Sequence, residues 1–329
     1  MTREIAPQVS VVITTHNEEA GIAGTLDSLK AQTDAPEFEV VMVDDRSTDA
    51  TIARAEAVRL AGLRVLHNAP DPASALTTRQ QALDLAFRAA KAPVIVTLDG
   101  DSTVPQGWVA AMAGPILAGD GPAVAGPITF APPTTAVARW QIADAAYYFE
   151  VAARLAPYGA GGVFFGSFAF RADLYTDIGG FDAIGGALTE DLAFARALQA
   201  AGHRIAFVPG PGPVEVAPCP SRDALIDRTI RVSAGPPSLL AAVLSIWPLT
   251  LMLTALLAPF GPGLLALFVL RFAAGAAFVR YAIKRTGAVA RGLNWLTYEI
   301  LAIGLALSVL ARIRQGGAKT NWGGQNYDR

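Results

Sequence analysis

This chain of 329 residues has one cysteine, Cys219, and three histidines. A single cysteine excludes an internal disulfide, and the scarcity of cysteine and histidine excludes a metal site of clustered sulfur and imidazole ligands. The first ten residues, MTREIAPQVS, lack the apolar core of a secretory signal segment. We therefore expect the soluble part of the chain to lie in a reducing cytoplasm.

Acidic residues are nearly absent from the C-terminal third. Between Pro236 and Leu310 the only acid is Glu299, whereas acids and bases are mixed before residue 231. Three apolar segments, 238–258, 264–283 and 293–311, fill this region, and each approaches the roughly 20 residues that cross a bilayer. The alternative, a set of buried core helices, would need a very large soluble partner to cover them.

Basic residues flank the first two apolar segments. Arg222, Arg228 and Arg231 precede the first, and Lys284, Arg285 and Arg291 follow the second. The uncharged connection APFGPG predicts a hairpin with both ends in the cytoplasm, at the inner membrane. Arg271 and Arg280 indicate that the second segment is tilted or partly interfacial, or that these two side chains snorkel toward the lipid headgroups. The third segment either crosses or lies along the interface, because Arg312, Arg314 and Lys319 follow it.

Short β-branched runs alternate with helical patterns in the first hundred residues. The pattern predicts strands at 9–15, 39–43, 63–67 and 93–98, and helices at 18–32, 47–59 and 78–90. This alternation is typical of parallel strands joined by crossover helices. We therefore predict an α/β fold with a Rossmann-like, mostly parallel sheet that binds ligands beyond the carboxyl ends of its strands.

The pattern after residue 118 is less regular. A Gly- and Pro-rich stretch, 119–133, predicts a sheet-edge excursion, followed by a helix at 135–155 and a strand at 166–170. A helix at 189–201, a strand at 204–208 and a Pro-rich linker complete the soluble part. The predicted organisation is a soluble domain, 1–235, then two or three membrane helices, 236–315, and a polar tail, 316–329.

An acidic turn follows the fourth predicted strand. In VTLDGDSTVPQGW, Asp99 and Asp101 are one residue apart, so both carboxylates can approach one cation or divide between a cation and a sugar hydroxyl. Asp-x-Asp is also common in solvated surface turns. The position at the end of a buried strand favours a ligand site.

Other polar side chains are predicted at the same sheet edge. Thr14, His16 and Glu18, in TTHNE, can surround a base and ribose with donors and acceptors. A histidine at such a position is more often a pocket or capping residue than a metal ligand. Asp44 and Asp45 end the second strand, where Asp45 can bind a ligand or cap a helix beginning at Ser47.

Four ordered segments carry a family resemblance: VSVVITTHNEEAGIAGTLDSLKAQT, FEVVMVDDRSTDAT, LDGDS and GGFDAIGGALTEDLAFARALQAAGHRIAFVP. Together they resemble the successive motifs of family 2 glycosyltransferases with the GT-A fold, over roughly residues 8–231. The tail NWGGQNY is similar to a membrane-attached branch that includes ceramide glucosyltransferase-like and hopanoid-associated enzymes, with Gln325 where that branch has arginine. The resemblance implies inverting transfer of a sugar from a nucleotide diphosphate, with UDP expected, to a lipid hydroxyl.

The resemblance also implies residue roles. Asp45 accepts the uracil N–H, Asp99 lies near the ribose, and Asp101, with Asp99, holds Mg²⁺ or Mn²⁺. Arg79 faces the diphosphate or is a plain surface arginine. Asp191 is the general base; the alternative is an ordinary acidic first turn capped by Thr189.

Further roles concern the acceptor and the diphosphate. Gly166 and Glu190 are expected at the acceptor cleft. RTIRV resembles the motif (Gln/Arg)-x-x-Arg-Trp, so Arg228 and Arg231 close over the diphosphate or attract anionic lipid. Val232 replaces the tryptophan of processive synthases, which disfavours polysaccharide synthesis. A processive synthase and a non-catalytic binder of nucleotide sugar or lipid remain the alternatives, and no feature predicts a nucleic-acid partner.

Overall fold

The computed structural model describes residues 6–233, 238–289, 292–315, 320–322 and 325–327, with side chains described as far as Gln315. Contacts divide the chain into two units. Unit 1 comprises residues 1–128 and 156–216, and unit 2 comprises residues 129–155 and 217–329. Residues 1–235, the predicted soluble domain, therefore contribute to both units.

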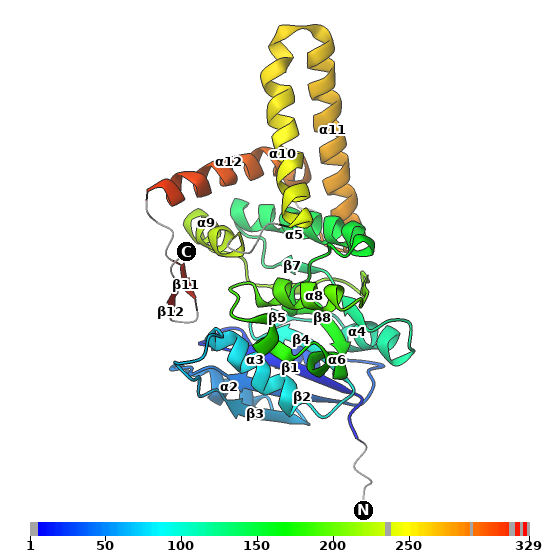
Figure 1. The fold of residues 1–329 in the computed structure, drawn as a ribbon, viewed down its shortest axis with the longest axis vertical. Helices are drawn as coiled ribbons and strands as arrows, with labels where there is room; N and C mark the ends of the chain where they lie inside the picture. The colour runs from blue at the N-terminus through cyan, green and yellow to red at the C-terminus, as the bar shows by residue number, and fades with distance from the viewer. Residues whose placement is uncertain (1–5, 234–237, 290–291, 316–319, 323–324, 328–329) are drawn as a thin grey trace, which may run out of the picture. The chain divides into compact units, whose positions relative to one another are not determined.

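Unit 1 is built on a seven-stranded sheet with the order β3-β2-β1-β4-β8-β6-β9 (Figure 1). Its strands are β1 (Val9–Thr15), β2 (Phe38–Asp44), β3 (Leu63–His67), β4 (Val94–Asp99), β6 (Ala123–Ala125), β8 (Phe168–Arg171) and β9 (Ile205–Phe207). Strands β1 to β4 are parallel, and β8 runs antiparallel to both β4 and β6. The predicted α/β fold with a mostly parallel sheet is confirmed.

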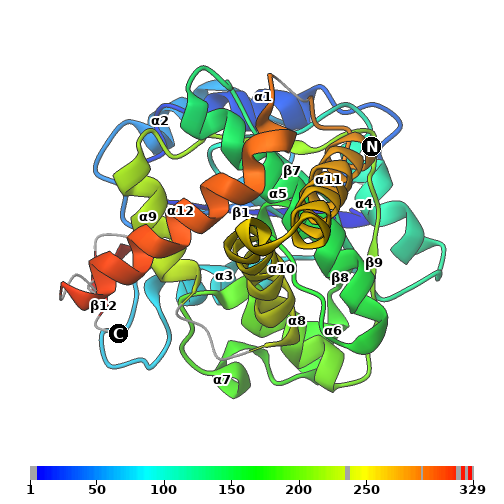
Figure 2. The ribbon, with the colours of Figure 1, turned by 90° about the horizontal axis from the view of Figure 1, so that it is seen from above.

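Helices cover both faces of this sheet, which is why every residue of β1 is buried. They are α1 (Ile22–Lys30), α2 (Thr51–Ala57), α3 (Thr78–Ala89), α4 (Trp108–Leu117), α6 (Asp173–Asp177), α7 (Gly180–Ile184) and α8 (Glu190–Ala200). Figure 2 shows α1 and α2 on one side of β1, and α3 and α8 on the other. Under α3 and α8 an aromatic cluster, including Phe87, Phe170 and Phe194, forms the core.

Three local features differ from the sequence prediction. Helix α4 was not predicted, because Gly114 and Pro115 inside it are typical helix breakers, although the buried face of Trp108 and Met112 packs well. The strand β10 (Val214–Val216), paired with β5 (Ser102–Thr103), is too short to leave a pattern. Gly166 lies in a 3₁₀ turn, Phe165–Ser167, rather than in the following strand.

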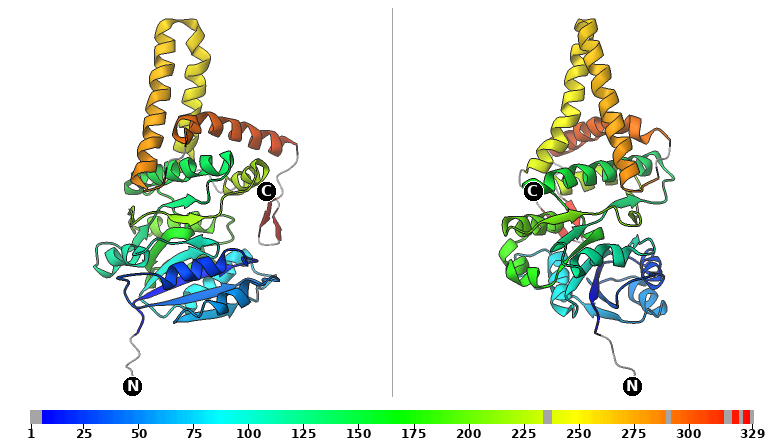
Figure 3. Two further views of the ribbon diagram at one scale, coloured as in Figure 1. Left: turned by 180° about the vertical axis from the view of Figure 1, so that it is seen from behind. Right: turned by 90° about the vertical axis from the view of Figure 1, so that its right-hand side faces the viewer.

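Unit 2 is helical. It contains α5 (Ala136–Leu155), α9 (Arg222–Val232), α10 (Leu239–Leu257), α11 (Pro262–Arg285) and α12 (Asn294–Arg314), with β7 (Ile128–Phe130) at the unit boundary. The last three helices are each long and apolar enough to cross a membrane. Figure 3 shows α10 and α11 as an antiparallel hairpin and α12 running across it.

The surface of the hairpin is apolar, as membrane association requires. Leu249, Leu253 and Leu256 of α10 are more than half exposed. In the C-terminal tail, β11 (Thr320–Trp322) pairs with β12 (Gln325–Tyr327). The side chains of that tail, with Lys319 and Arg291 named above, lie outside the described residues.

Arg271 is paired inside the helical unit, so the snorkelling predicted for it is wrong. Its guanidinium donates to the Glu299 carboxylate at 2.8 Å and to the Trp247 carbonyl at 2.5 Å, and its side chain is only 10 % exposed. Glu299 can approach Arg271 because Gly275 has no side chain. A Cβ at position 275 would overlap the Glu299 carboxylate. A charged side chain between apolar helices is tolerated when an opposite charge pairs with it, as Glu299 pairs with Arg271.

A buried carboxylate ties three strands together at the edge of the sheet where β1 and β2 begin. Glu39 of β2 accepts hydrogen bonds from Ser10 of β1 at 2.8 Å, Arg64 of β3 at 2.9 Å and the Lys91 amide at 2.7 Å. Burial alone would raise the pKa of Glu39, but these hydrogen bonds outweigh it and hold the pKa below its usual value.

Glu39→Gln is therefore expected to lower the free energy of unfolding by about 2 kcal/mol at neutral pH, because it removes a charged acceptor from three donors. Since the folded pKa is depressed, the difference is full above about pH 5, fades as the pH falls from the unfolded toward the folded pKa, and is lost below the folded pKa. Denaturant unfolding in detergent measures the difference in the free energy of unfolding and its dependence on pH. The exposed Glu56 provides the matched control, Glu56→Gln; equal stability of the two variants would contradict the prediction.

Candidate active site

The predicted polar residues meet at the carboxyl ends of adjacent strands of unit 1. Thr14 of β1 lies opposite Val43 of β2 and opposite Asp99 of β4. The loops after these strands therefore start side by side. Thr14 itself is almost fully buried in the sheet.

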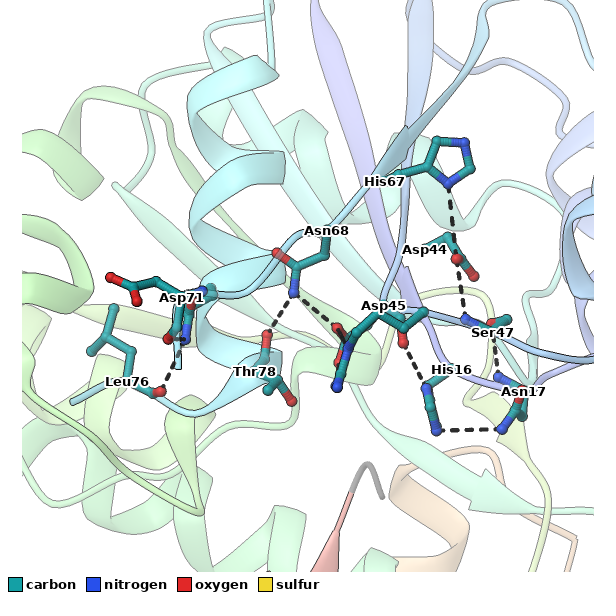
Figure 4. Close-up of polar contacts among 12 residues, drawn as sticks. His16, Asn17, Asp44, Asp45, Ser47, His67, Asn68, Asp71, Leu76 and Thr78 are labelled. Atoms are coloured by element: carbon teal, nitrogen blue, oxygen red, sulfur yellow. Dashed lines mark hydrogen bonds and ion pairs between the residues drawn. The ribbon is translucent and has the colours of Figure 1, made fainter. Parts of the chain in front are cut away.

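Hydrogen bonds lock the loop after β1 to the loop after β2 (Figure 4). The His16 ring contacts the Asp45 carbonyl at 2.6 Å through Nδ1, the Asn17 amide donates to Ser47 at 2.9 Å, and the Thr48 amide donates to the Asn17 side chain at 2.8 Å. Asn17 and Arg46 have left-handed backbones, with φ of 57° and 61°. Asparagine tolerates that conformation and arginine does so only under constraint, so the two loops form a rigid rim.

Asp45 is held by two side chains that flank it in space. Arg46 donates to both carboxylate oxygens, at 3.0 and 3.1 Å, and Asn68 donates at 2.9 Å. Asn68 is in turn anchored on the Thr78 carbonyl at 3.2 Å. Burial alone would raise the pKa of Asp45, but these hydrogen bonds outweigh it and hold the pKa low, so the carboxylate stays charged.

The alternative that Asp45 caps a helix beginning at Ser47 is wrong. The Ser47 amide donates to Asp44 at 3.2 Å, and α2 begins only at Thr51. The amides at its start are satisfied by Asp49 and Glu19. The Asp45 carboxylate instead binds the Arg46 and Asn68 side chains described above.

Three carboxylates gather near the turn after β4. Burial, followed by repulsion from Asp101 and Asp99, raises the pKa of Glu18 to about 7. Burial and repulsion from Asp99 raise the pKa of Asp101 to about 6. Burial and mutual repulsion thus raise the proton affinity of Glu18 and Asp101 at this edge of the sheet.

Arg79 joins this turn to the start of α8, and it is not a plain surface arginine. Its guanidinium donates to Asp99 at 2.7 Å and to Glu190 at 2.5 Å, with 22 % of its side chain exposed. It reaches both because α3 begins at Thr78, with a capping box between Thr77 and Gln80. Glu190, expected at the acceptor cleft, is nearly buried and bound to Arg79.

Asp191 follows Glu190 in the first turn of α8. Burial and the neighbouring Glu190 raise the pKa of Asp191 to about 7. Thr189 occupies the cap position but makes no capping hydrogen bond. The alternative that Thr189 caps an ordinary acidic first turn is therefore wrong in its cap. A carboxylate with a pKa near neutrality has the proton affinity of a general base.

Close backbone contacts shape the same region. A Cβ on Gly166 would lie 2.9 Å from the Asp99 carboxylate, so glycine there makes room for Asp99. A Cβ on Gly21 would lie 2.8 Å from the Asp101 backbone. Gln80 fixes the loop before α8, donating to the Gly185 carbonyl and accepting from the Ala187 amide, both at 2.9 Å.

The remaining predicted residues, Arg228 and Arg231, lie on α9 in unit 2. The Arg228 guanidinium lies 4.9 Å from the Phe130 ring centroid and 3.4 Å from the Gln141 side-chain oxygen. Their predicted role at the diphosphate stays a prediction.

The donor set fits a hard divalent cation. No group of three or more His, Cys, Asp or Glu side chains that could hold a metal occurs among the described residues. Carboxylate oxygens of Asp101 and Asp99 suit Mg²⁺ or Mn²⁺, which commonly complete their coordination with phosphate oxygens and water.

Sequence reasoning missed Asn68, Gln80 and Arg46. Asn68 follows β3 at the same sheet edge as Asp45, so its position after a strand was a usable signal. Gln80 stands three residues after Thr77, which is the spacing of a capping box. No sequence signal indicates the left-handed Arg46.

Comparisons place this chain among known proteins. A family model described as Glycosyl transferase family 2 matches residues 10–179. A Drosophila melanogaster protein, polypeptide N-acetylgalactosaminyltransferase 8, is 35 % identical over 119 residues, which are 35 % of this chain and 19 % of that protein. The chain thus spans about a fifth of this curated relative.

Solved structures share the fold. The mannosyltransferase PcManGT from Pyrobaculum calidifontis, solved with GDP-Man and Mn²⁺, has a TM-score of 0.52 and 21 % identity, covering 93 % of this chain and 88 % of its own. Glucosyl-3-phosphoglycerate synthase from Mycobacterium tuberculosis, solved with Mn²⁺, UDP and phosphoglyceric acid, has a TM-score of 0.41 and 25 % identity, covering 61 % and 68 %. The likeness to PcManGT shows that the central sheet is of the GT-A type.

Replacing Arg79 is expected to destabilise unit 1, because Glu190 is only 7 % exposed and would lose its counter-charge. Arg79→Met should lower the free energy of unfolding by about 3 kcal/mol, and Glu190→Gln in the same chain should restore part of it. Arg88→Met, on the same helix but 54 % exposed, is the control and should cost about 1 kcal/mol or less. Additive effects of Arg79→Met and Glu190→Gln in a double-mutant cycle would contradict the buried pairing.

Proposed function

Since this chain belongs to glycosyl transferase family 2, we propose that it moves a sugar from a nucleotide diphosphate, most simply UDP, to a lipid hydroxyl. The transfer inverts the anomeric carbon and takes place at the cytoplasmic face of the inner membrane. One observation carries this proposal: Arg79 links Asp99 of a cation-binding turn to Glu190, whose neighbour Asp191 has the pKa of a base.

The donor half of the proposal uses the rim of the sheet. Asp45 and His16 bind the base, with Thr14 and Glu18 nearby, and Asp99 lies at the ribose. Asp101, with Asp99, holds Mg²⁺ or Mn²⁺, which when bound neutralises the charge that grows on the departing diphosphate. The repelling carboxylates support this assignment, as does the Mn²⁺ in the PcManGT complex.

In the chemical step, Asp191 accepts the proton of the acceptor hydroxyl. The hydroxyl oxygen then bonds to the anomeric carbon from the face opposite the leaving group. The bond from that carbon to the diphosphate oxygen breaks, and the nucleoside diphosphate leaves with the electron pair. Arg79 binds both Glu190 and Asp99, so that of the two carboxylates in the first turn of α8 Asp191 is the one left to take the proton.

A lipid acceptor is supported by the apolar helices. A water-soluble acceptor gives no reason for three helices that are each able to cross a membrane. Gly166, whose missing Cβ makes room for the Asp99 carboxylate, lies beside the proposed donor site and is proposed to line the acceptor cleft.

Asp101→Asn and Asp191→Asn are each expected to reduce sugar transfer at least 100-fold without unfolding the protein, because one removes a metal ligand and the other removes the base. Release of nucleoside diphosphate and the mass of the extracted lipids measure the transfer. The exposed Asp120, changed to Asn, is the matched control. Near-normal turnover in either site variant would contradict the role assigned to Asp101 or Asp191.

The pH profile tests the base separately. Because the Asp191 pKa is raised to about 7, kcat/KM should fall about tenfold per pH unit below about pH 7, as the carboxylate becomes protonated. An aspartate with its usual pKa would leave the profile flat from about pH 5 to 7. A flat profile for the wild type at saturating Mn²⁺ would exclude Asp191 as a base with a raised pKa.

A further inference from the structure

Helix α12 is long enough to cross a membrane, yet both its ends contact other helices of unit 2. At its start, the Asn294 side chain donates to the Arg139 carbonyl of α5 at 3.0 Å, and the Trp295 ring lies 5.3 Å from the Arg280 guanidinium of α11. At its end, Arg312 donates to Asp223 of α9 at 2.7 Å. The two ends are therefore fixed by different partners.

All these partners lie at the same end of the α10–α11 hairpin. Arg280 is close to Arg285, where α11 ends, and α9 ends at Val232, a short connection before α10 begins at Leu239. The hairpin turns at Gly261, at its opposite end. A helix of 21 residues, about 31 Å long, that starts and finishes at the open end of the hairpin must lie across it, as Figures 1 and 3 show.

The two faces of α12 have opposite character. Its buried face carries polar contacts: Tyr298 donates to Asp144 of α5 at 3.0 Å, Glu299 binds Arg271, and Ser308 accepts from Arg222 at 2.6 Å. Its exposed face is apolar and repeats every three or four residues: Ile300, Leu301, Gly304, Leu307 and Leu310. This uncharged exposed face needs an apolar environment, whereas the helix ends need water.

We propose that α12 lies in the plane of the membrane, with its apolar face in the acyl-chain boundary, and that α10 and α11 insert more deeply into the bilayer. The occupant of the exposed face is therefore lipid. The face continues the apolar surface of the hairpin, which supports lipid rather than a second protein.

The ion pairs at the end of α12 support this orientation. Asp223 is 78 % exposed and Asp227 is 61 % exposed beside Arg312, and charges so exposed require water rather than hydrocarbon. If α12 crossed the bilayer, Arg312 would lie at the far side, away from α9. Trp295 and Arg280 at the other end are side chains typical of the membrane interface.

Single-cysteine labelling tests the topology. In a Cys219→Ser background, Gln315→Cys reports the end of α12, and Ala217→Cys reports the segment before α10. A membrane-impermeant maleimide applied to sealed vesicles of one orientation should label both variants from the same side. Labelling of Gln315→Cys from the opposite side would overturn the proposal.

Nitroxides attached to cysteines at Ile300, Leu307 and Leu310 then report depth in vesicles of mixed zwitterionic and anionic phospholipid. All three should be accessible to oxygen rather than to a water-soluble nickel complex, at one common depth. The comparison series on α11, at Leu265, Val269 and Tyr281, should show changing depth. A depth gradient along α12, or shielding that depends on protein concentration and so indicates a second copy, would contradict the proposal. Neither measurement requires sugar transfer, so both test the orientation of α12 independently of the proposed function.

Discussion

Repulsion between carboxylates is the constraint on which unit 1 depends. Glu18, Asp99 and Asp101 come together because parallel strands end at one edge, and their charge must be offset. Arg79 supplies one fixed positive charge and divides it between Asp99 and Glu190. Asp101 and Glu18 are left with raised proton affinities, so the protein alone does not neutralise this edge. In the proposed function, a bound cation and its phosphate ligands would complete the balance.

Unit 2 satisfies a different constraint, since a buried charge in apolar helices must be matched within the protein. Arg271 meets Glu299 because Gly275 leaves room for the carboxylate, and this contact joins α11 to α12. The same pair fixes where α12 crosses the hairpin. A single glycine thus determines how closely the two helices approach.

Much of unit 1 could be predicted because its strands are regular. Strands β1 and β3 were predicted with the bounds that the structure has, and the polar side chains after the strands meet as expected. Helix α4 could not be predicted, since Gly114 and Pro115 contradict a helix that tertiary packing nevertheless stabilises. The partners of Arg79 could not be predicted either: Glu190 is 111 residues away, and no local pattern encodes such a contact. The direction of α12 also depends on distant contacts, because its own length and hydropathy suffice for a crossing helix.

The buried amide of Gln80 has a mechanical consequence for the loop that precedes α8. Its oxygen accepts from Thr77 and Ala187, and its nitrogen donates to Gly185, so one side chain is shared by the start of a helix and by a loop more than 100 residues away. Lifting the loop would leave the fully buried Gln80 nitrogen without its Gly185 acceptor and the oxygen with Thr77 as its remaining partner, at a cost of about 1–3 kcal/mol for each lost bond. Local opening there is therefore rare, and Asp191 is presented by a stiff support rather than by a moving lid.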